Sequence, residues 1–163
     1  MGRAPSTSGS RFELFDLDPD LDRALELIKE SGARIVGLQV PEGLKRIASD
    51  LAREIEEKTD AEVIVSGDPC YGACDVDLDL CRAADLVIHV GHSEMLEGDP
   101  LSNKVVYLEA RMRADVKETV EKAADLFSAR RVGVLTTVQH VHRMDDIVEV
   151  LEKKGIEIGR AHV

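Results

Sequence analysis

Hydrophobic residues recur with a helical period in two segments of the first sixty residues. The first segment has the i, i+3, i+4, i+7 spacing of one buried helix face, and Gly32 follows it as a candidate C-cap: Leu21, Ala24, Leu25 and Ile28. The second begins after the turn-like tract Pro41-Glu42-Gly43 and has the same spacing: Leu44, Ile47, Ala48, Leu51, Ala52 and Ile55. The pattern predicts two amphipathic helices packed on a core.

Short apolar runs lie between the helical segments. The run at 34–40 is apolar without alternation, which is typical of a parallel strand covered on both faces. Similar runs lie at 62–66, 86–90 and 104–108, with helical patterns near 77–84 and over 116–127. Strands that alternate with helices predict an α/β fold, a three-layer sandwich with a mainly parallel sheet.

The end of the chain repeats the pattern of its beginning. A strand at 131–135, a polar segment, an amphipathic helix and a strand at 156–158 follow the same order as the segment 36–65. We therefore expect a mobile arm at 1–16, a first domain at 17–128 and, at 129–163, the first βαβ unit of a second related domain. A unit of about 35 residues cannot bury both its faces alone. We therefore expect this chain to be a fragment of a larger protein.

Composition narrows the class of protein. The chain is 44% hydrophobic but 3% aromatic, which predicts an aliphatic core. No apolar run approaches the roughly 20 residues of a membrane helix, and the first ten residues are small and polar, so we expect a cytoplasmic protein without membrane contact. A net charge of −11 argues against direct nucleic-acid binding. The 33% of charged residues and the scarcity of Asn and Gln are typical of a hyperthermophile.

Polar residues follow the predicted strands, where parallel strands place their ligands. We expect a site lined by residues that follow three strands: Gln39, Glu42, His92, Ser93, Thr137, Gln139 and His140. Simpler roles remain open for some of them. Thr137 could cap the following helix, Glu42 could be a favourable acid at a helix start, and His92 could be satisfied by the backbone.

The three cysteines lie within twelve positions. An odd, clustered set argues against a disulfide framework, and Cys-x3-Cys without a second pair is incomplete as a tetrahedral zinc signature. Asp75 is expected to cap a helix whose positive end favours the thiolate form of Cys74, the form that ligates metals. Cys81 is expected to be buried, and the sequence leaves burial and ligation equally open for Cys70.

Four tracts carry a family resemblance. They occur in this order: Val40-Pro41-Glu42-Gly43-Leu44, Tyr71-Gly72-Ala73-Cys74-Asp75, His89-Val90-Gly91-His92-Ser93 and Thr136-Thr137-Val138-Gln139-His140. Together they resemble the 2-(3-amino-3-carboxypropyl)histidine synthases of diphthamide biosynthesis, of the archaeal type. The resemblance covers the chain from about residue 18 onward.

The resemblance implies a specific chemistry. Family members have three related α/β domains, each giving one cysteine to a [4Fe-4S] cluster that cleaves S-adenosylmethionine. The 3-amino-3-carboxypropyl group is then transferred to a histidine of translation elongation factor 2. The archaeal enzymes are homodimers and need an electron donor. By this resemblance Cys74 is the first cluster ligand, whereas Cys70 and Cys81 match none, and no cysteine follows Cys81.

Two other functions are compatible with the residues. One is a small metal- or redox-binding module in which Cys70 and Cys74 act together, so that replacing either abolishes metal uptake. The other is a flavodoxin-like nucleotide-binding domain without iron. The absence of Gly-x-Gly-x-x-Gly disfavours this second alternative.

Overall fold

Four parallel strands form the central sheet of the first unit. The computed structural model describes residues 15–95 and 103–159. The strand order is β3, β2, β4, β5, and every neighbouring pair is parallel. The strands are β2 (Ile35–Gln39), β3 (Glu62–Val65), β4 (Leu86–Val90) and β5 (Val105–Leu108). The predicted mainly parallel α/β sheet is confirmed.

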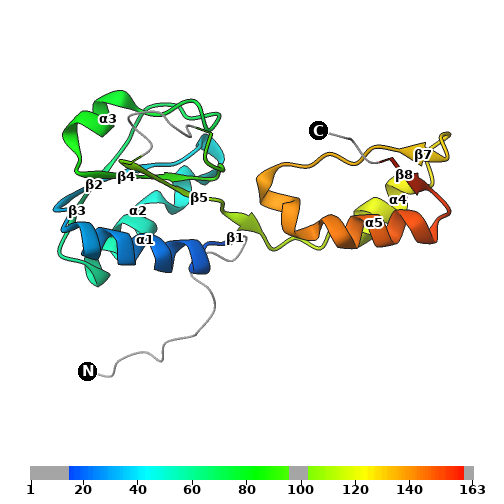
Figure 1. Ribbon diagram of the computed structural model, residues 1–163, viewed down its shortest axis with the longest axis horizontal. Coiled ribbons are helices and arrows are strands. Elements are labelled where there is room, and N and C mark those ends of the chain that lie inside the picture. Colours follow the sequence, from blue (N-terminus) through cyan, green and yellow to red (C-terminus); the bar gives the residue numbers. More distant parts are fainter. Residues whose placement is uncertain (1–14, 96–102, 160–163) are drawn as a thin grey trace, which may run out of the picture.

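Helices cover both faces of this sheet (Figure 1). Helices α1 (Asp18–Ser31) and α2 (Ala48–Lys58) pack on one face, where their buried side chains form a single core with strands β2, β4 and β5. The shorter α3 (Leu78–Ala83) covers the other face through Leu80 and Cys81. Gly32 ends α1 in the left-handed conformation, with φ of 67°, as its position predicts.

The core of the described residues is aliphatic, as the composition predicts. Tyr107 is the one aromatic residue among the buried hydrophobic side chains that the structure describes. Across residues 15–95 and 103–159, no helix is sufficiently long and apolar to traverse a bilayer.

The helix predicted after Pro41 has two parts. A 3-10 helix, η1 (Glu42–Ile47), runs directly into α2. The Leu44 N–H donates to the Pro41 carbonyl at 2.8 Å, so the tighter turn starts at once after the proline. Helical structure therefore begins at Glu42, at the carboxyl end of β2.

Asp77, and not Asp75, caps α3. Its Oδ1 accepts from the Leu80 N–H at 2.8 Å, whereas the Asp75 carboxylate accepts from the Tyr71 N–H at 3.1 Å. The expectation that Asp75 caps the helix was wrong, because the chain uses this carboxylate to close the preceding loop. The helix begins at Leu78, so its first turn does not include Cys74.

Gly37 gives a stability prediction. A Cβ at this position would lie 2.6 Å from Cγ of Leu80, so Gly37→Ala forces α3 away from the sheet. We expect a loss of about 1–3 kcal/mol in the free energy of unfolding. The control is Gly67→Ala, because a Cβ added at Gly67 would meet nothing within 4 Å. Denaturant titration, monitored by tyrosine fluorescence, measures the free energy of unfolding of both variants. Equal stability of the two variants would contradict the close packing of Gly37 against Leu80.

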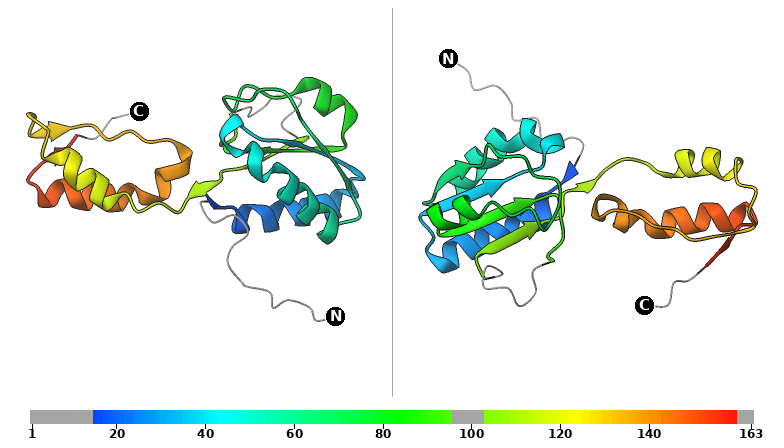
Figure 2. Two further views of the ribbon diagram at one scale, coloured as in Figure 1. Left: turned by 180° about the vertical axis from the view of Figure 1, so that it is seen from behind. Right: turned by 90° about the horizontal axis from the view of Figure 1, so that it is seen from above.

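The second unit follows a short two-stranded link. Strand β1 (Phe15–Asp16) pairs antiparallel with β6 (Arg111–Met112). The last two residues of the expected arm, 15 and 16, therefore form a strand, and residues 1–14 of that arm lie outside the described residues. The unit then contains α4 (Lys117–Ala124), β7 (Arg131–Val132), η2 (Val138–Arg143), α5 (Met144–Lys153) and β8 (Glu157–Ile158). It extends away from the first unit (Figure 2).

The second unit repeats the first in its element order. Strand β7 pairs parallel with β8, and a six-residue 3-10 helix again runs directly into an α-helix between them. The 3-10 helices start at Glu42 and Val138, which are 96 positions apart, and α2 and α5 start at Ala48 and Met144, also 96 apart. This matching order supports the interpretation of two related units.

The second unit has a small core. Three of its side chains are buried in one cluster: Ala124, Leu151 and Ile156. Leu135 is 97% exposed. Helix α4, expected in the first domain, packs through Val120 and Ala124 on this cluster. The packing therefore favours placing α4 with the second unit rather than ending the first domain at residue 128.

Candidate functional site

The polar centre lies at the carboxyl ends of β2 and β4. The loop after β3, residues 66–77, folds over this edge of the sheet and is held there by side chains from the strands. Gln39 Nε2 donates to the Asp75 carbonyl at 2.7 Å, and the Tyr107 hydroxyl donates to the Ala73 carbonyl at 3.2 Å. The Ser66 hydroxyl donates to the Asp77 carboxylate at 2.6 Å. The cysteine loop is thus fixed against the sheet.

Gln39 is the centre of these contacts. Its side chain is 1% exposed, and its Oε1 accepts from the Asp77 N–H at 3.1 Å while lying 3.0 Å from Nδ1 of His89. Because Oε1 is an acceptor here, Nδ1 of His89 carries a proton and donates it. The amide of Gln39 therefore positions the loop and His89, and its contact with substrate stays a prediction.

Three side chains of types that can ligate a metal ion converge beside Gln39. Nε2 of His89 lies 2.8 Å from Nδ1 of His92 and 3.9 Å from Sγ of Cys70. Cys70 is 1% exposed and His89 is fully buried, whereas His92 is half-buried. The ring of Tyr107 lies 5.0 Å from that of His89 and closes the cluster.

The cluster has no charge at neutral pH. Burial, and to a smaller degree the neighbouring His92, lowers the pKa of His89 to about 4. Burial also lowers the pKa of His92, against the raising effect of its hydrogen bond to the Tyr71 backbone. Burial, with the Asp75 charge next in size, raises the pKa of the Cys70 thiol. Both imidazoles are therefore neutral at pH 7, and Nδ1 of His92 donates its proton to Nε2 of His89 across the 2.8 Å contact.

Cys74 has a different environment from the other two cysteines. Its side chain is exposed. A Cβ atom built on Gly72 would lie 3.7 Å from Sγ of Cys74, at ordinary van der Waals distance, so Gly72 leaves space beside this sulfur. Cys81 lies on α3 and is buried against the sheet, as expected, and burial raises the pKa of its thiol. Among the cysteines, Cys74 alone presents its sulfur to a large external group.

The structure brings one residue of the second unit to this edge. Gln139 Nε2 donates to the Gly91 carbonyl at 2.5 Å, directly before His92. Thr137 precedes η2, but its side chain makes no cap hydrogen bond, so the simple capping role is wrong. His140 is half-buried, and its Nδ1 is buried without a hydrogen-bond partner.

Two further candidates lie in ion-pair and hydrogen-bond networks. The Ser93 hydroxyl donates to Oε1 of Glu109 at 3.1 Å, and Arg111 binds Oε2 of the same carboxylate at 3.0 Å. Glu42 starts η1 and pairs with Lys45 at 2.7 Å. Lys45 also donates to the Gly67 carbonyl at 2.8 Å, so this ion pair contributes to holding the loop.

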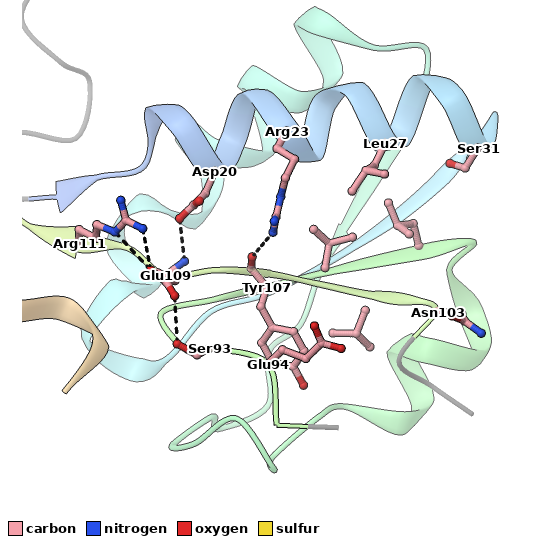
Figure 3. A pocket seen from close by; sticks show the side chains of 13 residues that line it. Asp20, Arg23, Leu27, Ser31, Ser93, Glu94, Asn103, Tyr107, Glu109 and Arg111 are labelled. Atoms are coloured by element: carbon pink, nitrogen blue, oxygen red, sulfur yellow. Dashed lines mark hydrogen bonds and ion pairs between the residues drawn. The ribbon is translucent and has the colours of Figure 1, made fainter. Parts of the chain in front are cut away.

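Two cavities flank the polar centre. One, of about 600 Å³, runs between α1 and β5 and includes Arg23, Ser93, Glu109 and Arg111 (Figure 3). The other, of about 630 Å³, lies beside α3 and is rich in carboxylates: Asp68, Asp75, Asp77 and Asp79. Cys74 is exposed and lines neither of these two cavities.

The sequence interpretation missed two members of the cluster. It gave His89 no place among the site residues and left burial and ligation equally open for Cys70, although the ligand atoms of both lie close to that of His92. The available signal was the His-x-x-His spacing across a strand end, at positions 89 and 92. The contribution of Cys70 depends on how the loop folds over β4, which the spacing does not encode.

Comparison with known proteins identifies the family. The model of the diphthamide synthesis protein family matches residues 40–162. The 2-(3-amino-3-carboxypropyl)histidine synthase of Pyrococcus horikoshii is 36% identical over 139 residues, which cover 83% of this chain and 40% of that protein. The human 2-(3-amino-3-carboxypropyl)histidine synthase subunit 1 is 31% identical over 138 residues, covering 82% and 32%.

Solved structures agree with this assignment. The crystal structure of Dph2 from Pyrococcus horikoshii has a TM-score of 0.67 and 32% identity, over 89% of this chain and 43% of that one. A second structure of the same protein, with a 4Fe-4S cluster, has a TM-score of 0.65 and 33% identity, over 85% and 41%. The chain spans about two fifths of the Pyrococcus protein's length. It belongs to the diphthamide synthesis protein family.

Proposed function

We propose that this chain supplies the first cysteine ligand and part of the substrate-binding wall of a 2-(3-amino-3-carboxypropyl)histidine synthase. The reaction is transfer of a 3-amino-3-carboxypropyl group from S-adenosylmethionine to a histidine of translation elongation factor 2, the first step of diphthamide biosynthesis. The observation that carries the proposal is the exposed thiol of Cys74, at the carboxyl ends of parallel strands in a family member.

The residues present fit one ligand of an iron–sulfur cluster. Cys74 offers an accessible sulfur on a loop tied down at Gln39 and Tyr107, with Gly72 leaving space beside it. Cys70 and Cys81 are buried, so a four-iron cluster could not reach them without opening the loop or helix. Such clusters are held by several thiolates, so the remaining ligands would come from outside these 163 residues.

A bound [4Fe-4S] cluster would supply the electron that breaks a carbon–sulfur bond of S-adenosylmethionine. The residues of this chain hold the loops at the edge of the sheet and orient the side chains on them. Gln139 fixes the loop after β4 through the Gly91 carbonyl and brings the second unit to the edge. We assign substrate contact to candidates from the segments that follow β2, β4 and β7: Glu42, His92, Ser93, Thr137 and His140. Gln39 contributes by holding His89 and the loop in place.

The proposal includes partners and location. The protein substrate is elongation factor 2, the assembled enzyme is a homodimer supplied by an electron donor, and the reaction takes place in the cytoplasm. The charge-rich composition supports the archaeal type, although the relatives include human and Pyrococcus proteins alike. The alternative, a module in which Cys70 and Cys74 share a metal, would require Cys70 to leave the interior.

A chimera tests the function. Residues 1–163 of this chain replace the matched portion of the Pyrococcus horikoshii relative, and iron and sulfide are added anaerobically. We expect the broad visible absorbance of the cluster, S-adenosylmethionine cleavage and a mass increase of elongation factor 2. A chimera that has native circular dichroism and a cluster, yet cleaves no S-adenosylmethionine, would refute the assignment.

A further inference from the structure

We propose that Cys70, His89 and His92 bind a single divalent metal ion of the zinc type, at a site separate from the thiol of Cys74. The three side chains come from the cysteine loop, strand β4 and the loop after β4. Their ligand atoms all lie within 4.8 Å of one another. This inference does not depend on the proposed transferase function.

The spacing of the ligand atoms is close to that of a tetrahedral site. Metal–nitrogen bonds of about 2.0–2.1 Å and a metal–sulfur bond of about 2.3 Å imply separations of about 3.3 Å between nitrogens and about 3.6 Å from sulfur to nitrogen. The structure has 2.8 Å between the two imidazole nitrogens and 3.9 Å from Cys70 Sγ to His89 Nε2. An outward shift of His92 by about 0.5 Å admits the ion, and His92 lies on a loop.

The surroundings of His89 prepare it for this role. Metal-binding histidines usually donate their other ring N–H to an oxygen, which fixes the tautomer and the ring orientation. Oε1 of Gln39 accepts from Nδ1 of His89 and is itself fixed by the Asp77 N–H. Nε2 of His89 is therefore left with its lone pair directed at Cys70 and His92.

The local charges suit a dication. Asp75 interacts electrostatically with Cys70, His89 and His92, and Glu42 adds negative charge near Cys70, opposed there by Lys45. Binding replaces the thiol proton of Cys70 with the metal and releases that proton to solvent, while the proton on Nδ1 of His92 moves to Nε2 of the same ring and frees Nδ1 as a ligand. The thiolate and the Asp75 carboxylate together then balance a 2+ ion.

The donor set indicates the class of metal. One sulfur and two imidazole nitrogens favour zinc-type ions over magnesium or calcium, which prefer oxygen. Three protein ligands leave a fourth position for water. The site differs from a cluster site because Cys70 is 1% exposed, so a four-iron cluster could not reach its sulfur without opening the loop.

Cobalt(II) serves as the probe in an anaerobic titration of the purified 163-residue chain. We expect one equivalent to give visible d–d bands and one thiolate-to-cobalt charge-transfer band. Cys70→Ser and His92→Gln should each weaken binding by more than about 100-fold. Cys81→Ser, which changes a buried thiol outside the cluster, and Cys74→Ser should leave the titration unchanged.

Three results would overturn the proposal: no charge-transfer band in the parent chain, an unchanged titration in Cys70→Ser, or equal loss in Cys74→Ser. The last result would instead indicate a metal shared by Cys70 and Cys74. If a variant fails to fold, X-ray absorption of the zinc-loaded parent chain identifies the atoms that bind the metal. One sulfur and two imidazole nitrogens support the site, and any other protein donor set contradicts it.

Discussion

Replacing Cys74 with Ser is expected to lower S-adenosylmethionine cleavage by the chimera by more than about 100-fold. Loss of a residue that merely orients a metal ligand already costs about 10–100-fold, so loss of a ligand should cost more. The fold should survive, because the side chain is exposed and supports no described packing. Product formation and the visible absorbance of the reconstituted cluster measure the effect.

Cys81→Ser is the matched control for this variant. It makes the same sulfur-to-oxygen change at a side chain buried between α3 and β4. We expect cluster absorbance and cleavage to stay close to those of the parent chimera, even if stability falls. Equal cleavage by Cys74→Ser and the parent would remove Cys74 from the set of ligands.

Gln39→Leu is expected to lower the free energy of unfolding of the first unit by about 3 kcal/mol or more. The substitution leaves three groups without their partner: Nδ1 of His89, the Asp77 N–H and the Asp75 carbonyl. Each unpaired buried polar group costs about 1–3 kcal/mol. Tyrosine fluorescence isolates this unit, because the chain has no Trp and its only tyrosines are Tyr71 and Tyr107.

Gln139→Leu is the comparison for Gln39→Leu. It removes a single described hydrogen bond, from Gln139 to the Gly91 carbonyl, so its expected cost is about 1 kcal/mol. The expected losses in the free energy of unfolding therefore differ because Gln39 makes three hydrogen bonds and Gln139 makes one described hydrogen bond. If Gln39→Leu were as stable as the parent chain, the Gln39 amide would be free for substrate and would not hold the loop.

The sheet could be predicted from the sequence because each of its strands is marked by a short apolar run of neighbouring residues. The runs at 34–40 and 86–90 are apolar without alternation, and the structure places β2 and β4 within them at the centre of the sheet. The parallel arrangement followed from the helices between them. The same logic placed the polar residues at one edge, where Gln39 and Gly91 to Ser93 lie.

The details of the site could not be predicted because they depend on distant contacts. Asp75 and Asp77 are equally good caps by residue type, and the choice depends on Tyr71, Ser66 and Gln39. Gln39 contacts partners 36 to 50 positions away, so its burial is a tertiary property. The packing of α4 on Leu151 and Ile156 is likewise a tertiary property, because the sequence pattern of its apolar face does not say which neighbour that face contacts.

Iron anomalous diffraction from anaerobically grown crystals of the chimera tests the central claim most directly. We expect an iron cluster at the carboxyl ends of β2 and β4, with continuous density from one iron to Sγ of Cys74. Iron held entirely by other residues, with the Cys74 side chain left in solvent, would contradict it.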